Sequence, residues 1–148
     1  MIRSLLFAFL GLVAGVVVAG VLVIGVEAIS SIVHPPPAGV SELKGEAFFE
    51  AMCTHVAAYP VWVLAVVVLL WGLTISVAVG VGALIGGRVA GSLVGLLLFA
   101  MLLLNVWLMG LPYPLWFKVV EVVTFPLFFL AGLYLVTAKK PPSTQLAA

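Results

Sequence analysis

Four long stretches of apolar residues, separated by short polar or proline-rich segments, dominate the pattern of the chain. They cover approximately residues 4–33, 61–86, 89–111 and 115–137. Each is at least as long as the ~20 residues that an α-helix needs to cross a bilayer, and none alternates like a membrane β-strand. Because backbone groups in lipid must pair within their own segment, the runs favour helices. The pattern predicts an all-α integral membrane protein with four transmembrane helices, forming one membrane domain over residues 1–148.

The connections between the predicted helices differ in length. Residues 86–88, Gly-Gly-Arg, leave almost no loop, which predicts a tight antiparallel hairpin. Residues 111–114, Leu-Pro-Tyr-Pro, form another short turn, in which one proline ends a helix and the next begins one. Only residues 34–60 make a long connection, and it begins with three prolines that must be extended.

The long connection carries a helical pattern of its own. Ser41 is predicted to cap a short helix that runs to Val56. Three glutamates, at positions 42, 46 and 50, recur every four residues along one face, and apolar side chains line another. This predicts an amphipathic helix that lies on the outer membrane surface or covers the mouth of the bundle.

Composition and charge agree with a lipid environment. The chain is 66% hydrophobic and only 7% charged, whereas soluble domains have about 25% charged residues. The net charge of +1 indicates no nucleic-acid partner, and the single Cys53 excludes an intrachain disulfide. Arg3, Arg88, Lys139 and Lys140 fall on one predicted side, and Lys44 and Lys118 fall on the other. This asymmetry predicts a multi-pass protein of the cell (cytoplasmic) membrane with both termini cytoplasmic, and residues 139–148 are predicted to be a disordered tail.

Small residues recur at the four-residue spacing that lets membrane helices approach closely. Gly11 and Gly15 form one such ridge, Gly72 and Gly80 flank a second, and residues 83–95 continue the spacing across the inner turn. The spacing indicates tight packing. It leaves open whether the ridges serve one compact chain, a homo-oligomer or a larger membrane complex.

A carboxylate, a serine and a histidine follow one another near the end of the first predicted helix: Glu27, Ser30 or Ser31, and His34. Spacings of three or four residues place them on one face, and Ser31 is taken as the member of the polar face. Glu27 lies eight residues before Pro35, or about 10 Å inside the end of the helix. Because an ionisable side chain is costly in lipid, we expect this face to turn towards the bundle interior.

Asn105, Lys118 and Glu121 lie near the same membrane surface on the third and fourth predicted helices. Glu121 is about 9 Å inside the end of its helix. Glu27, Asn105 and Glu121 are therefore predicted at similar depth in one leaflet, with His34 and Lys118 closer to the headgroups. We refer to these residues, together with Ser31, as the polar membrane cluster.

Two interpretations of the polar membrane cluster follow from the sequence. In the first it is a packing hub, in which Lys118 pairs with Glu121 and Asn105 hydrogen-bonds to a neighbouring helix. In the second it is a site for protons, an ion or a small polar ligand. The aromatic residues at the same boundary are interpreted as an interfacial belt without a ligand role: Tyr59, Trp107, Tyr113 and Trp116.

The sequence shows no motif for enzymatic chemistry. It has no phosphate-binding glycine loop, no H-E-x-x-H, no G-x-S-x-G and no cysteine pair, so neither an enzyme nor a cofactor is predicted. His34 and His55 are the only histidines and the only candidate metal ligands of that type. An acid–base pair of Glu27 and His34, acting on a lipid or quinone, is disfavoured because about 10 Å separates them along the helix.

Several of these residues form motifs shared with other proteins. The motif E-x6-H-P-P-P at residues 27–37, Tyr-Pro at 59–60 and N-x6-P-x-P-x-W-F at 105–117 resemble a family of small bacterial membrane proteins. The resemblance covers residues 27–117 and implies a helical protein of the bacterial inner membrane, but that family is uncharacterised and supplies no activity. Its members often have a histidine where this chain has Tyr113, which disfavours a metal site that pairs His34 with such a histidine. Small multidrug transporters also have four helices and a glutamate in the first, but they are shorter and lack the long loop.

The expected function is that of a small non-enzymatic membrane protein. Short loops and abundant small residues favour a structural or accessory subunit of a membrane assembly. The alternative is a small homo-oligomeric carrier or channel for protons, cations or a small polar solute, using Glu27 and Glu121. In low dielectric, two neighbouring carboxylates favour proton binding.

Overall fold

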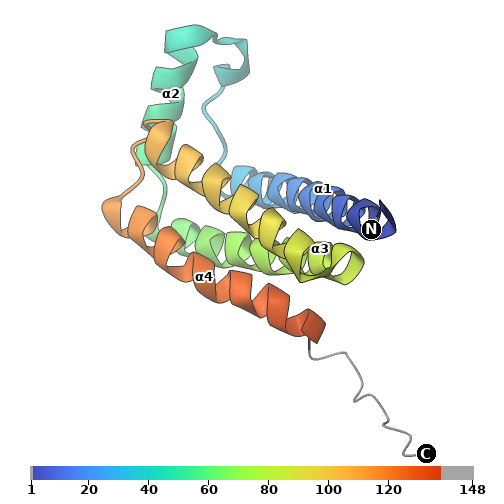
Figure 1. Cartoon of the computed structure of the whole chain (residues 1–148). Helices are drawn as coiled ribbons and strands as arrows, with labels where there is room; N and C mark the ends of the chain where they lie inside the picture. The colour runs from blue at the N-terminus through green and yellow to red at the C-terminus, as the bar shows by residue number, and fades with distance from the viewer. Residues whose placement is uncertain (1, 138–148) are drawn as a thin grey trace, which may run out of the picture.

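The protein is all-helical over the part of the chain that the structure, a computed structural model, describes, which is residues 2–137 (Figure 1). In chain order the elements are α1 (Ile2–Val33), the 3-10 turn η1 (Val40–Glu42), α2 (Gly45–Ala57), α3 (Val61–Leu103), the π-helical turn η2 (Leu104–Leu108) and α4 (Leu115–Thr137). Three of them, α1, α3 with η2, and α4, are long and apolar enough to cross a membrane. The fold is therefore that of a helical membrane protein. The predicted disordered tail, residues 139–148, lies outside the described residues.

The helix α3 reverses direction at Gly87, as the glycine pair in the sequence predicts. Gly87 has φ 78° and ψ 176°, a conformation that does not occur within a helix. A Cβ placed on Gly91 would lie 2.9 Å from the carbonyl oxygen of Val79, although twelve residues of straight helix span about 18 Å. The two halves of α3 therefore lie side by side, and Figure 1 shows them as the green and yellow segments. We call them α3a (residues 61–86) and α3b (residues 88–103).

Replacing Gly87 by alanine is expected to destabilise the fold by about 1–3 kcal/mol, because its backbone conformation is accessible almost only to glycine. Unfolding by heat or SDS in detergent measures the loss. Gly20→Ala is the matched control, since Gly20 is helical and a Cβ there meets nothing within 4 Å. Equal stability of the two variants would contradict the assigned turn.

The ridges of small residues pack within the chain. A Cβ on Gly11 would lie 2.6 Å from the carbonyl oxygen of Gly82, so α1 contacts α3a without intervening side chains. On the other side, Gly132 of α4 approaches the carbonyl oxygen of Ser76, and the Ser76 hydroxyl donates a hydrogen bond of 2.8 Å to the carbonyl of Phe128. The spacing in the sequence therefore corresponds to contacts of α1 and α4 with α3.

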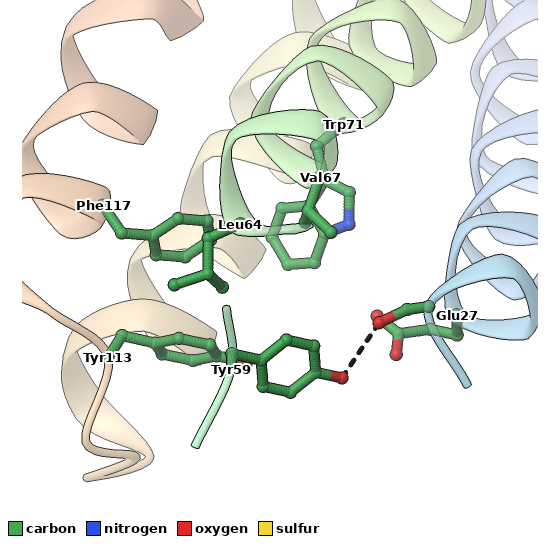
Figure 2. Close-up of a pocket in the computed structure, with 8 residues that line it drawn as sticks. Glu27, Tyr59, Leu64, Val67, Trp71, Tyr113 and Phe117 are labelled. Atoms are coloured by element: carbon green, nitrogen blue, oxygen red, sulfur yellow. Dashed lines mark hydrogen bonds between the residues drawn. The ribbon is translucent and has the colours of Figure 1, made fainter. Parts of the chain in front are cut away.

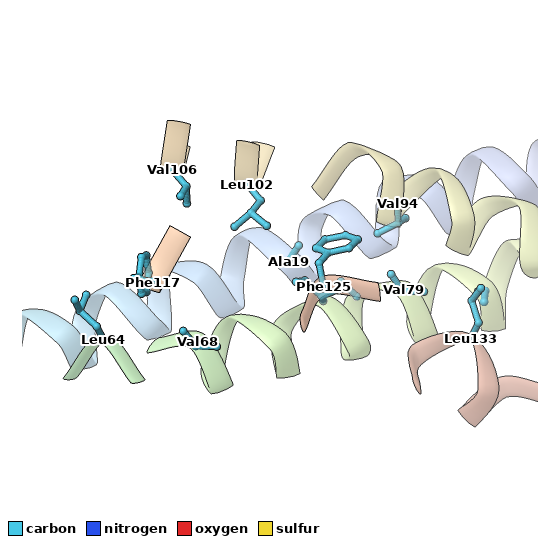
Figure 3. Close-up of a cluster of buried hydrophobic side chains, with 13 residues drawn as sticks. Ala19, Leu64, Val68, Val79, Val94, Leu102, Val106, Phe117, Phe125 and Leu133 are labelled. Atoms are coloured by element: carbon cyan, nitrogen blue, oxygen red, sulfur yellow. The ribbon is translucent and has the colours of Figure 1, made fainter. Parts of the chain in front are cut away.

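The core runs along the bundle between these helices (Figure 3). Its best-buried members include Ala78, Val79, Val94, Val106 and Phe117. The outward faces are also apolar, with large exposed side chains along α1, α3 and α4. Apolar residues on both the inside and the outside are what a helix bundle in lipid requires.

The end of the bundle that carries α2, here called the α2 end, contains the polar residues. In Figure 1, α1 begins and α4 ends at the opposite end of the bundle. The helix α2 projects away from the bundle and is buried only at His55 and Val56, so it does not cover the mouth of the bundle, which was one of the two placements predicted. The helix begins at Gly45 rather than after Ser41, because Lys44 is extended and Ser41 lies in the separate turn η1. Similarly, the α-helix expected to reach residue 111 ends at Leu103 and continues as the π-helical η2.

Candidate functional site

A small polar cavity opens at the α2 end between α1, the start of α3 and the start of α4. Its volume of about 30 Å³ is enough for one or two water molecules, each of which needs about 10–15 Å³ by this measure. The lining residues are Glu27, Ser30, Tyr59, Leu64, Val67, Trp71, Tyr113 and Phe117. Figure 2 shows the side chains of Tyr59, Trp71 and Glu27 around one space. Polar groups from four segments thus meet at a place where lipid-facing helices come together.

Ser30 and Tyr59 connect α1 to the start of α3. Their hydroxyls form a hydrogen bond of 2.9 Å, drawn as the dashed line in Figure 2. Ser31, which the sequence places in the polar membrane cluster, is instead exposed and donates to the carbonyl of Glu27 at 2.8 Å. Glu27 also lines the cavity, but it is an exposed residue, so the face of α1 that carries Glu27 and Ser31 lies at the rim of the cavity and does not turn into the bundle interior as the sequence predicts.

Two histidines pack with Tyr59 at the α2 end, next to the cavity. The rings of His34 and His55 stack with centroids 4.5 Å apart and planes within 10°. Tyr59 packs against both, at 4.4 Å from His34 and 5.1 Å from His55. His34 Nε2 lies 3.3 Å from the carbonyl oxygen of His55, which accepts a hydrogen bond from it. We call this cluster the histidine clasp, since it joins the end of α1 to the end of α2.

The histidine clasp does not resemble a metal site. No group of three or more His, Cys, Asp or Glu side chains within residues 2–137 is arranged to hold a metal ion. The stacked geometry also leaves the two rings face to face rather than directing their nitrogens at a common point. The weak metal candidates from the sequence, His34 and His55, are therefore brought together but as packing partners.

Glu121 is the most unusual residue of the polar membrane cluster, and it lies outside the lining of the cavity. Its side chain is 2% exposed, and its Oε1 is buried without a hydrogen-bond partner. Within residues 2–137, the structure shows no ion pair for it. Lys118, the expected i,i+3 partner, places its Nζ 5.5 Å from the centre of the Trp107 ring. The ion pair of the packing-hub interpretation is thus replaced by a cation–π contact.

The register of α1 on α3a fixes the depth of Glu27. Gly15 lies against the carbonyl oxygen of Ala78, and the two helices run antiparallel. Glu27, twelve residues further along α1, therefore lies level with Val66 of α3a. This is about 8 Å inside the first residue of α3, at 1.5 Å per residue.

The register of α4 on α3a fixes the depth of Glu121. Ser76 bonds to the carbonyl of Phe128, and these two helices run parallel. Glu121, seven residues before Phe128, therefore lies level with Leu69. The two carboxyl-bearing residues Glu27 and Glu121 are thus separated by about 4.5 Å along the bundle axis, so the matching depth expected from the sequence also follows from the helix contacts.

Tyr113 lines the cavity beside Glu27 and Tyr59. Burial is the main cause that raises its pKa to about 12, and the negative charges of Glu27, Tyr59 and Glu121 act in the same direction. The hydroxyl consequently keeps its proton over the physiological pH range. Tyr113 also stacks on Phe117 with ring centroids 5.0 Å apart, which holds it between α1 and α4.

Two further buried polar atoms are without partners. Nε1 of Trp71, in the lining of the cavity, and Oδ1 of Asn105 form no hydrogen bond. Asn105 lies in η2, and its amide nitrogen is 4.0 Å from the sulfur of Met109. A π-helical turn inside a longer helix is frequently found at functional sites.

The sequence leaves Ser30 and Ser31 as alternatives for the polar face of the first helix, and the structure places Ser30 in the cavity. Three other residues of the cavity are not predicted as site residues: Tyr59, Trp71 and Tyr113. Trp71 lies within an apolar run. Tyr59 and Tyr113 were interpreted as interfacial aromatic residues. The available signal was that both tyrosines stand next to a proline in a turn between helices, where a ring is held close to the helix ends.

No family model, curated protein or solved structure matches this chain. The likeness to small bacterial membrane proteins therefore stays an expectation from the motifs. The function is inferred from the cavity and the residues around it alone.

The histidine clasp is expected to make the stability of the protein depend on pH. Burial and the neighbouring His34 lower the pKa of His55 from its usual value of about 6.5. The unfolded chain then binds protons more tightly, so stability is complete above pH ~6.5 and decreases as the pH falls below it. Thermal unfolding between pH 5 and 8 measures this loss. His55→Phe, which keeps a ring in the stack, is expected to reduce it, and an unchanged pH profile would contradict the role of His55.

Proposed function

We propose that this chain is a small four-span protein of the cell membrane that binds a proton or a small cation at a site formed by Glu27 and Glu121. The observation that carries the proposal is the burial of Glu121 without an ion pair among residues 2–137. A buried carboxylate without a compensating charge is strongly unfavourable. It becomes acceptable when a proton or a cation neutralises it, so the residue favours a ligand of that charge.

The four-span arrangement is supported by the turn at Gly87. A straight helix of the 43 residues in α3 would be about 65 Å long, twice the ~30 Å of the hydrocarbon core. When the helix is divided at Gly87, α3a forms one segment and α3b with η2 forms the other. Each segment is long enough to cross the membrane once. Arg3 and Arg88 then lie at the end opposite α2, which favours a cytoplasmic location of that end and of both termini.

The cavity also favours a ligand over a packing hub. A buried polar hub is stable when its members satisfy one another, and a partly satisfied one is worse than an apolar core. Three buried polar atoms, on Trp71, Asn105 and Glu121, have no hydrogen-bond partner. Buried polar atoms without hydrogen-bond partners are more consistent with a bound species than with a packing hub.

Transport and binding assays test the proposal. The protein is reconstituted in liposomes that contain a pH-sensitive dye, and uptake of protons, ²²Na⁺ and ⁸⁶Rb⁺ is compared with empty liposomes. Wild type is expected to take up one of these ions or to bind it stoichiometrically in detergent. Glu121→Gln is expected to reduce the uptake rate or the binding affinity for that ion at least 10-fold. Glu46→Gln, an exposed residue of α2, is the matched control. If wild type and Glu46→Gln neither bind nor move protons or these cations, the proposal is wrong.

A second proposal, an accessory subunit or homo-oligomer, is favoured by the position of α1. This helix packs chiefly against α3, and its other faces expose large apolar side chains such as Phe9, Val21 and Ile24. A partner helix fits such a surface as well as lipid does. Cross-linking in membranes followed by purification in a mild detergent tests it, and a monomer that moves ions by itself would exclude it.

A further inference from the structure

We infer that the ligand of this site is a proton, which Glu27 receives at the α2 end and Tyr113 relays to Glu121, where it is held in a closed position. This inference rests on the proposed function and specifies its ligand. It concerns Glu27, Tyr113, Glu121 and the water that fits the cavity. These residues come from α1, from the turn before α4 and from α4 itself.

The lining of the cavity suits a proton better than a metal cation. Calcium takes six to eight oxygen ligands at about 2.3–2.6 Å, and magnesium takes six. Here much of the wall is apolar, and the indole N–H of Trp71 is a donor that cannot ligate a cation. The hydroxyls of Ser30 and Tyr59 already bond to each other. A space of about 30 Å³ with this lining accepts a water molecule, which can pass a proton between hydroxyl and carboxyl groups.

Tyr113 is placed to act as the link. It lines the cavity together with Glu27, and Phe117, on which it stacks, lies one helical turn before Glu121. Glu121 lies outside the lining of the cavity, on the same face of α4 as Phe117, so the step from Tyr113 to Glu121 passes along this face. Because a phenol both donates and accepts a hydrogen bond, Tyr113 accepts a proton from one side while it gives its own to the other.

The proton balance of the transfer is simple. A proton from water binds to the carboxylate of Glu27 and forms an O–H bond there. It then moves, directly or through the cavity water, to the hydroxyl oxygen of Tyr113 while the original hydroxyl proton moves to the carboxylate of Glu121. The net change is one proton displaced from water to Glu121, with Tyr113 regenerated and no electron transferred.

The titratable groups around this route are few. Glu27 and Tyr59 line the cavity together with Tyr113, and Glu121 lies one helical turn beyond Phe117, on which Tyr113 stacks. The histidine clasp stands at the α2 end, and Lys118 points away to Trp107. Protons therefore enter from the α2 end, past Tyr59 and the clasp.

The route ends at Glu121 in this conformation. Deeper in the bundle, the hydroxyls of Thr74, Ser76 and Thr124 all donate to backbone carbonyls. In residues 61–103, α3 has a single ionisable side chain of Asp, Glu, Lys, Arg or His type, Arg88 at the far turn. We therefore expect Glu121 to be loaded from one side only, without continuous conduction across the membrane.

Infrared difference spectroscopy tests the inference on the full chain in detergent or nanodiscs. The C=O stretch of protonated carboxyl groups is followed against pH in wild type, Glu27→Gln, Glu121→Gln and Tyr113→Phe, with Glu46→Gln as control. Two carboxyl bands are expected, of which Glu121→Gln removes one. After a pH jump, Tyr113→Phe is expected to slow the appearance of the Glu121 band at least 10-fold. The variant Tyr113→Phe keeps the aromatic ring that stacks on Phe117, and thermal unfolding checks that this variant is folded.

The outcomes separate this inference from the proposed function. If millimolar Na⁺, K⁺ or Ca²⁺ displaces the carboxyl bands at constant pH, the ligand is a metal cation, so the inference fails while the proposed function stands. If no carboxyl band titrates and no cation changes the spectrum, both fail. If Tyr113→Phe folds and protonates Glu121 as fast as wild type, the relay is overturned although the proton site remains.

Discussion

Replacing Gly15 by leucine is expected to prevent stable packing of α1, with a loss of at least about 3 kcal/mol in unfolding free energy, beyond the usual cost of overpacking. A Cβ at this position would lie 2.9 Å from the carbonyl oxygen of Ala78 and closer still to a methyl group of Val94. The backbone of α3a cannot yield, so α1 would have to move outward along its whole contact. Because α1 packs chiefly against α3, the other contacts described for it lie at its end, in the histidine clasp and the hydrogen bond of Ser30 to Tyr59.

The measurement is unfolding by SDS or heat in detergent, with Gly25→Leu as the matched control. Gly25 lies on the same helix, and a Cβ there meets nothing within 4 Å. The control is expected to fold like wild type. If Gly15→Leu were as stable as Gly25→Leu, α1 would not pack on α3 through its small residues, and the register that places Glu27 level with Val66 would also be lost.

Replacing Glu121 by methionine is expected to raise the thermal stability of the purified protein, by about 1–4 kcal/mol at pH 7. The side chain is 2% exposed, with an unpartnered oxygen. Replacing even a buried ion pair by apolar residues of similar volume is often neutral or stabilising by up to about this amount, and Glu121 has no ion pair among residues 2–137 whose loss would offset the gain. Methionine is unbranched like glutamate and adapts to the same space. A gain in stability together with a loss of ion binding would show that the carboxyl group is kept for function.

The opposite result would favour a different interpretation. A variant Glu121→Met that unfolds or aggregates would identify Glu121 as a structural partner, as in the packing hub. The search would then turn to the complex that contains this subunit. Glu46→Met on the exposed face of α2 controls for the change of one charge.

The depth of the polar residues could be predicted from the sequence because helix rise and membrane thickness are fixed quantities. Counting residues from the prolines placed Glu27 and Glu121 at similar depth, and the registers set by Gly15 and Ser76 agree with this placement. The turn at Gly87 was predictable for a similar reason, since a glycine pair next to an arginine interrupts an apolar run. In both cases the physical constraint depends only on residues that are close together in the sequence.

The direction and partners of side chains could not be predicted in the same way. Lys118 and Glu121 have the spacing of an ion pair, but the ring of Trp107 from η2 attracts the lysine instead. Ser30 rather than Ser31 enters the cavity because the buried face of α1, set by Gly11, Gly15 and Ala19, includes position 30. Which of two adjacent residues faces inward depends on the rotation of the helix, and packing sets that rotation.

The sequence by itself determined that the chain is a helical membrane protein, where its helices lie and at what depth its carboxyl groups are found, because hydrophobicity and helix rise are local properties. Only the tertiary structure decided that Tyr59 and Tyr113 meet Glu27 at one cavity, that the two histidines stack and that Glu121 stays unpaired. These contacts join segments up to about a hundred residues apart in the chain, and their geometry depends on how closely the glycine ridges let the helices approach.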